Sequence, residues 1–192
     1  MKLTLLPLAI AAFLALAGSA VASRRSVAPK PVASEPDHAI TEELRGRALG
    51  AKAAEFGIDA SVLPEGVWGV VMDTRYPEGL ASVVALADGS ASLYLGLGSG
   101  VIGGHAHEPV RAAAKAAVAE ASTQIDAFSA TTNLEPPPLG RTKVFVLTSR
   151  GVYASDAIPE EMLGNGEHAL SPVFYSVQSV ITELRLASEG SR

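Results

Sequence analysis

The chain contains no cysteine among its 192 residues. That absence excludes disulfides, thiolate ligands for metals, cysteine nucleophiles and lipidation of an N-terminal cysteine, so the folded part must be held together by its hydrophobic core. Charged residues make up only 18% of the chain, with 15 Lys and Arg against 20 Asp and Glu. Nucleic-acid binding requires a clustered basic face. The few basic pairs here, Arg45 and Arg47 among them, are interpreted as solvated surface, and we expect no nucleic-acid partner.

Long hydrophobic runs are also scarce, and the only one that could span a bilayer is at the N-terminus. Lys2 gives a short positive region, residues 3–17 form an apolar region, and Ala20 and Ala22 are small residues at the two positions that a signal peptidase reads. We therefore predict a signal peptide over residues 1–22 and export to a bacterial periplasm or the cell exterior, with no membrane association after cleavage. The alternative is an uncleaved membrane anchor.

The next segment, residues 23–38, is rich in Pro and Ser and has no hydrophobic periodicity. This composition predicts a disordered tether rather than a folded element. The remaining residues, 39–188, are one domain's worth of chain and long enough to bury a core.

Hydrophobic patterning and turn residues then predict a helix followed by a three-stranded antiparallel meander. In order, these elements are residues 40–56, 67–74, 80–87 and 90–97. The helix is expected to bury a face that contains Ile40 and Phe56. Asp88–Gly89 indicates a two-residue hairpin loop, which would place Val84 opposite Leu93.

The second half begins with Pro109, which predicts a helix start near residue 108 and an apolar stripe from Val110 onward. A strand hairpin, one helical turn and a last helix that starts at Ser171 follow. The hairpin strands are residues 142–149 and 152–155. We therefore predict an α+β fold with a five-stranded, mainly antiparallel sheet and helices packed on it. This element order resembles that of the profilin-like or roadblock/longin group, and the resemblance implies a fold only.

Between the meander and that helix, residues 98–103 match the pattern G-x-G-x-x-G. In dinucleotide-binding folds such a loop and the following helix N-terminus hold a pyrophosphate. The antiparallel hairpin before the loop and Pro109 after it argue against that fold. The remaining hypothesis is a binding module for a small anionic ligand at the loop and helix start. Its candidate residues are Gly98, Ser99, Gly100, Gly103, Gly104, His105 and His107.

Enzymatic readings depend on the same segment. His105 and His107 could place two imidazoles on one side of an extended segment, which suits a metal, but no spacing identifies a third ligand among His168, Glu108 and Asp73. A catalytic triad that uses Ser99 as its nucleophile is a further alternative, although Ser99 lacks the G-x-S-x-G context of such a nucleophile. We expect no catalytic residue, no metal and no cofactor. A metal-dependent or hydrolytic enzyme that uses His105 and His107 is the second alternative.

The first hypothesis is an exported, non-catalytic domain that binds a partner protein or a second copy of itself. Its interface is predicted at the edge of the meander, with Leu93, Tyr94 and Leu95 as contact residues, because an exposed strand edge accepts a further strand. Trp68 and Tyr94 are otherwise interpreted as packing residues within strands.

Overall fold

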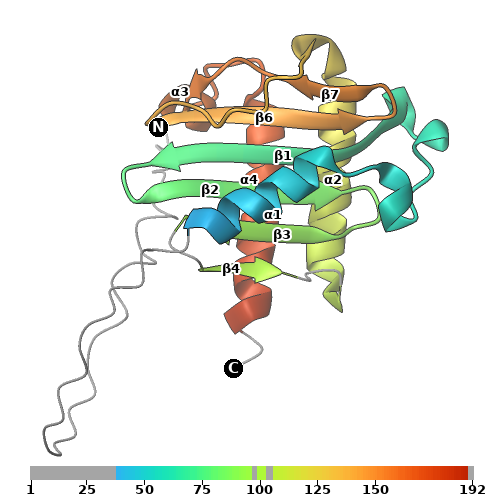
Figure 1. The fold of residues 1–192 in the computed structure, drawn as a ribbon, viewed down its shortest axis with the longest axis horizontal. Helices are drawn as coiled ribbons and strands as arrows, with labels where there is room; N and C mark the ends of the chain where they lie inside the picture. The colour runs from blue at the N-terminus through green and yellow to red at the C-terminus, as the bar shows by residue number, and fades with distance from the viewer. Residues whose placement is uncertain (1–37, 97–98, 103–105, 190–192) are drawn as a thin grey trace, which may run out of the picture. The chain divides into compact units, whose positions relative to one another are not determined.

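The computed structural model describes residues 38–96, 99–102 and 106–189. The predicted signal peptide and nearly all of the predicted tether lie outside these residues. The described part is an α+β fold with an eight-stranded sheet, in which every strand pair is antiparallel (Figure 1). The predicted α+β class with a mainly antiparallel sheet is therefore confirmed.

The strands lie in the sheet in the order β4-β3-β2-β1-β6-β7-β5, with β8 beside β6. Their bounds are β1 Val67–Tyr76, β2 Gly79–Leu86, β3 Ala91–Leu95, β4 Ser99–Ile102, β5 Ser129–Ala130, β6 Arg141–Thr148, β7 Gly151–Ala154 and β8 Ile158–Pro159. The α-helices are α1 His38–Gly50, α2 Glu108–Thr123, α3 Glu160–Gly164 and α4 Ser171–Glu189. Four short 3-10 turns complete the described elements: η2 Ala53–Phe56, η3 Ala60–Val62, η4 Pro64–Gly66 and η6 Ile125–Ala127.

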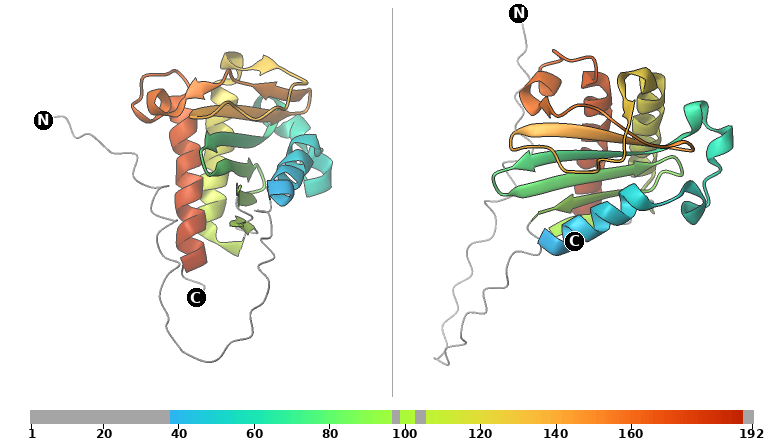
Figure 2. Two further views of the ribbon diagram at one scale, coloured as in Figure 1. Left: turned by 60° about the vertical axis from the view of Figure 1, so that its left-hand side comes forward. Right: turned by 45° about the horizontal axis from the view of Figure 1, so that its top comes forward.

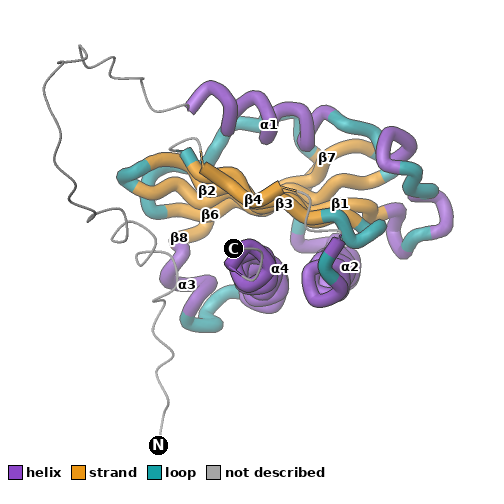
Figure 3. Tube along the Cα trace, turned by 90° about the horizontal axis from the view of Figure 1, so that it is seen from below, coloured by secondary structure: helices purple, strands orange, loops and turns teal. Residues whose placement is uncertain are grey.

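The elements form three layers. α2 and α4 lie side by side on one face of the sheet and α1 crosses the other face (Figures 2 and 3). Because side chains alternate along a strand, β1 contributes Met72 to the core under α2 and α4 and Val71 to the core under α1. With both faces covered, β1 is buried over most of its length, which explains its nearly continuous apolar sequence.

α2 begins at Glu108 with Pro109 in its first turn, as the sequence predicts. It buries Val110, Ala114 and Ala117 against the sheet and against α4. Small alanine side chains allow the helix backbone to approach its neighbours closely. In the described part of the chain, no helix has the length and hydropathy needed to cross a membrane.

The prediction of five strands is wrong, because β4, β5 and β8 were not anticipated. β5 and β8 have two residues each, too few to show an alternating pattern. β4 is Ser-Gly-Val-Ile, and its serine and glycine have low strand preference. All three are specified by tertiary pairing rather than by local sequence.

The predicted hairpin register is also wrong by one residue: Val83, not Val84, lies opposite Leu93. The Leu86 N–H donates to the Ser90 carbonyl at 2.9 Å, so the loop has three residues rather than two. Gly89 is its last residue and has a φ of 95°. A turn that ends in a glycine with positive φ is the usual form of a three-residue hairpin loop.

The predicted inner face of the first helix is a further correction. Ile40 and Phe56 are 47% and 42% exposed, and α1 instead turns Thr41, Arg45 and Leu49 to the sheet. Two of these contacts are polar and therefore absent from a hydrophobic pattern. The Thr41 hydroxyl, for example, donates to the Leu95 carbonyl at 2.9 Å.

Candidate functional site

The candidate interface is the sheet edge formed by β4. β3 pairs with β2 on one side and with β4 on the other, so it is an inner strand and not the edge that the sequence predicts. Leu93 is 6% exposed and packs in the α2/α4 core, with Leu95 packed against the same core. Tyr94 packs on the opposite face. Within the described residues, β4 ends the sheet at this side (Figure 1).

β4 lies unusually close to β3. Gly100 is paired with Tyr94, and a Cβ at Gly100 would lie 2.3 Å from the Leu93 carbonyl oxygen. No side chain fits at that distance, so the glycine is required by close backbone approach. Its neighbour Val101 packs against the α2/α4 core, whereas Ile102 is 67% exposed. β4 is therefore anchored by one side chain and presents another to solvent.

The hydrogen-bond alternation of the neighbouring hairpin determines how the backbone of β4 is oriented. The bond from the Leu86 N–H to the Ser90 carbonyl marks a hydrogen-bonded pair, and such pairs recur at every second residue of an antiparallel ladder. Because Leu86 and Ser90 form a hydrogen-bonded pair, Val83 and Leu93, three positions along the ladder, form a non-hydrogen-bonded pair. The N–H and C=O of Leu93 therefore point away from β2 and toward β4. Gly100 and Ile102 consequently direct their N–H and C=O groups away from the sheet, where a further strand could bond to them.

Exposed apolar side chains are also present on the two helices that flank this edge. Ile40 on α1 precedes Thr41, whose hydroxyl bonds to the β3 carbonyl of Leu95. Leu186 on α4 is 56% exposed, and α4 contacts both β3 and β4. Of the three exposed side chains Ile40, Leu186 and Ile102, only Ile102 belongs to β4 itself.

The remaining residues predicted for a ligand or metal site are only partly described. Gly98, Gly103, Gly104, His105 and the side chain of Ser99 lie outside the described residues, and Gly100 belongs to β4 rather than to a loop. His107 is exposed at the N-cap of α2 and its side chain forms no cap hydrogen bond. In the same first turn, Glu108 forms an ion pair with Arg111. In the described part of the chain, no three His, Asp or Glu residues are grouped so that they could hold a metal ion.

His168 and Asp73, the other residues considered for a metal site or a triad, already form hydrogen bonds within the fold. The His168 Nδ1 accepts a hydrogen bond from the Leu170 N–H at 3.1 Å. Asp73 is fully buried, and its two carboxylate oxygens accept hydrogen bonds from Arg45 and Ser82. Both side chains therefore hold the fold together at their positions.

The Asp73 network is the principal polar feature that sequence reasoning missed. The Arg45 Nε donates to Asp73 at 2.6 Å, the Arg45 Nη2 donates to the Leu134 carbonyl at 2.6 Å, and the Ser82 hydroxyl donates to Asp73 at 2.7 Å. Burial raises the pKa of the Asp73 carboxyl above its ordinary value, while Arg45, Ser82 and Lys143 act in the opposite direction. Two sequence signals were present: an aspartate that continues a buried strand, and a serine on the next strand.

A second partly buried polar contact joins the sheet to α3. The Tyr76 hydroxyl donates to Glu160 at 2.6 Å. Burial and the Glu160 carboxylate together raise the pKa of Tyr76, so the phenol stays protonated as a donor. The Thr74 hydroxyl lies beside the phenol and also bonds to the Thr142 hydroxyl at 2.8 Å. The contact between Tyr76 and Glu160 positions the helical turn α3 against the sheet.

Comparison with protein families, with curated proteins and with solved structures finds no match to this chain. Its function must therefore be argued from its own residues.

Proposed function

We propose that this chain is an exported, non-catalytic domain whose function is protein association, and that the β4 edge of one copy pairs with the β4 edge of a second copy. The observation that supports this proposal is the character of the edge itself. Natural proteins protect exposed strand edges with charged residues, prolines or bulges. The sequence of β4 contains no charged residue and no proline, and Ile102 at its end is 67% exposed.

A second copy is the simplest partner for such an edge. Two identical strands can pair antiparallel about a two-fold axis, so one surface serves both sides of the interface. β4 carries no charge that would repel its own copy across the axis. The outward backbone groups of Gly100 and Ile102 would gain partners, and the exposed Ile102 side chain would be removed from water.

Export is the second part of the proposal and depends on residues 1–22. Mass measurement of the protein recovered from the exporting cell should give a chain that begins at Ser23. A chain that retains Met1 and fractionates with membranes would support the uncleaved anchor instead. The resemblance of element order to the profilin-like or roadblock/longin group likewise stays a prediction about the fold.

Sedimentation velocity over a range of protein concentrations tests the association. We expect the wild-type chain to sediment as a dimer that dissociates on dilution. Ile102→Lys places a charge at the outer edge and should weaken dimerisation by at least about tenfold, because an unpaired ammonium would have to be buried at the interface. Val62→Lys is the matched control, since Val62 is 75% exposed on η3.

The control variant should dimerise like the wild type, and both variants should unfold at the wild-type temperature when diluted below the dissociation constant. A wild-type chain that remains monomeric at concentrations of about 100 μM, where weak but specific dimers are populated, would contradict the proposal. Equal loss of dimer in both variants would also contradict it, because the effect would then not belong to β4.

A further inference from the structure

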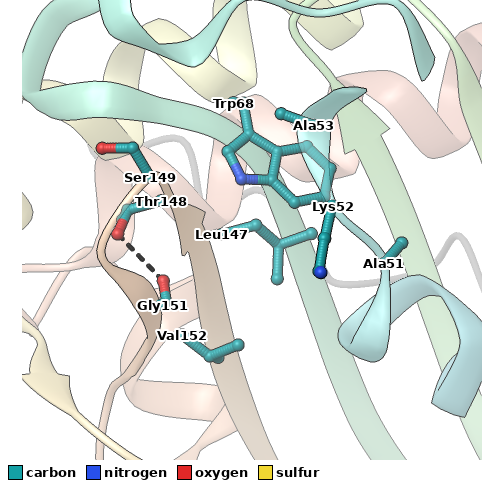
Figure 4. A pocket seen from close by; sticks show the side chains of 9 residues that line it. All are labelled: Ala51, Lys52, Ala53, Trp68, Leu147, Thr148, Ser149, Gly151 and Val152. Carbon is teal, nitrogen blue, oxygen red and sulfur yellow. Dashed lines mark hydrogen bonds between the residues drawn. The ribbon is translucent and has the colours of Figure 1, made fainter. Parts of the chain in front are cut away.

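A groove of about 370 Å³ opens between the segment that leads into η2 and the β6–β7 hairpin, on the α1 side of the sheet. Its apolar wall includes the Trp68 indole and the side chains of Leu147 and Val152, and Lys52 and Ser149 lie at its polar rim (Figure 4). This volume is within the range of small-molecule sites, which are mostly apolar with a few placed polar groups.

Trp68 gives this groove an unused hydrogen-bond donor. The side chain is only 3% exposed, and within the described residues its indole Nε1–H forms no hydrogen bond. The nitrogen is not among the fully enclosed unpaired polar atoms of that part of the chain, so it reaches the groove. Figure 4 shows the indole nitrogen on the side of the ring that is turned toward Leu147. Buried tryptophans usually satisfy this N–H. Here the donor is left facing the groove.

The Lys52 ammonium is a second donor at the rim. The Lys52 ammonium has no carboxylate within ion-pair distance in the described part of the chain. The nearby Glu55 carboxylate accepts from the Lys52 backbone N–H at 2.9 Å. Ser149 is exposed, but its hydroxyl packs against Gly66 and points away from the groove (Figure 4). By contrast, the Thr148 hydroxyl is already bonded to the Gly151 carbonyl at 2.9 Å.

We propose that this groove binds a small monocarboxylic acid with an apolar or aromatic body. An ammonium and an indole N–H can each donate to an oxygen of one carboxylate. The indole face and the Leu147 and Val152 side chains would receive the apolar body. A neutral apolar molecule would leave the donors unmatched, and a short polar acid would leave the apolar wall in water. The site is independent of the β4 edge, which lies on the opposite side of β1 in the sheet order.

The chain carries its own probe for this site, because Trp68 is its only tryptophan. Titration of the full chain with 3-phenylpropionate should change the tryptophan emission saturably, with a dissociation constant of about 1 mM or below. In a ¹⁵N-labelled sample the single indole N–H resonance should shift with the same dissociation constant. The neutral analogue 3-phenyl-1-propanol should bind at least about tenfold more weakly, and acetate, which lacks the apolar body, should not bind.

Lys52→Gln tests the charge without disturbing the core, since Lys52 is exposed. It should weaken 3-phenylpropionate binding by about tenfold and leave the binding of the alcohol unchanged. Lys115→Gln removes an exposed lysine of α2, on the other face of the sheet, and should bind like the wild type. The proposal is overturned if no saturable change occurs up to about 10 mM, if the alcohol binds as tightly as the acid, or if Lys52→Gln binds like the wild type.

Discussion

Arg45 and Asp73 form an ion pair beneath α1, with the Arg45 Nε 2.6 Å from the Asp73 Oδ2 and side chains that are 8% and 0% exposed. The pair joins α1 to the central strand β1. α1 has little else with which to hold the sheet: of its described residues, Leu49 is the only large apolar side chain that is fully buried. Because a buried ion pair must recover a large desolvation cost, its value lies in fixing where the helix sits as much as in added stability.

The first prediction concerns the loss of one partner. Arg45→Met leaves the Asp73 carboxylate buried without its cation and leaves the Leu134 carbonyl without its donor. The free energy of unfolding should fall by about 3–5 kcal/mol, the usual cost of an uncompensated buried charge. Urea unfolding at neutral pH measures this change.

Two further variants show whether the pair itself is responsible. The double variant Arg45→Met/Asp73→Val should lose clearly less free energy of unfolding than the sum of the losses of the two single variants, because no charge then remains buried. The exposed pair of Arg150 and Glu65, 3.6 Å apart with both side chains more than half exposed, is the matched control. Glu65→Gln should cost less than about 1 kcal/mol. Additive single effects at Arg45 and Asp73 would show that the two residues are not coupled.

The second prediction is a pH dependence that belongs to Asp73. Burial raises the pKa of this carboxyl in the folded chain above its ordinary value of 3.8. As the pH rises from 3.8, the unfolded chain therefore releases this proton before the folded chain does. The folded state then binds more protons than the unfolded state, so the contribution of Asp73 to the free energy of unfolding falls until the pH passes the folded pKa.

Other carboxylates titrate in the same pH range, so the contribution of Asp73 must be obtained by comparing the wild type with a variant that lacks this carboxyl. Asp73→Asn removes the titration and keeps a side chain of nearly the same shape. The free energy of unfolding of the wild type minus that of Asp73→Asn, measured in urea at a series of pH values from about 4 upward, should decrease with pH and then level off. A difference that rises with pH would mean that Arg45 and Lys143 outweigh desolvation and that the folded pKa is lowered.

Most elements of this fold could be predicted because their local sequence carries the signal. The continuous apolar run predicts β1, Pro109 predicts the start of α2, and a helical stripe of apolar residues predicts α4. The partners of Arg45 could not be predicted in the same way. Asp73 is 28 residues away in the sequence, and an arginine on a helix resembles a solvated residue until its acceptor is known.

The candidate sites were harder to predict for related reasons. β4 is a strand only because β3 lies beside it, and the glycine that seemed to indicate a ligand loop is required by that close pairing. Trp68 was predicted to be a packing residue, and it is buried. The groove beside its N–H could not be predicted, because the segment around Lys52 and the β6–β7 hairpin come together next to Trp68 only in the folded chain.

The last prediction concerns the glycine that lets β4 approach β3. Gly100→Ala adds a single methyl group, which would lie 2.3 Å from the Leu93 carbonyl oxygen, so β4 must move away from β3. Residues 99–102 should lose hydrogen-exchange protection and the chain should lose its dimer, while the core unfolding transition changes by less than about 1 kcal/mol, because β4 lies at the outer edge of the sheet. Gly46→Ala is the control: a Cβ there meets nothing within 4 Å, and the added helix preference should stabilise α1 by up to about 1 kcal/mol with no change in association. If Gly100→Ala keeps both the exchange protection of β4 and the dimer, the close β3–β4 pairing is not what positions the edge.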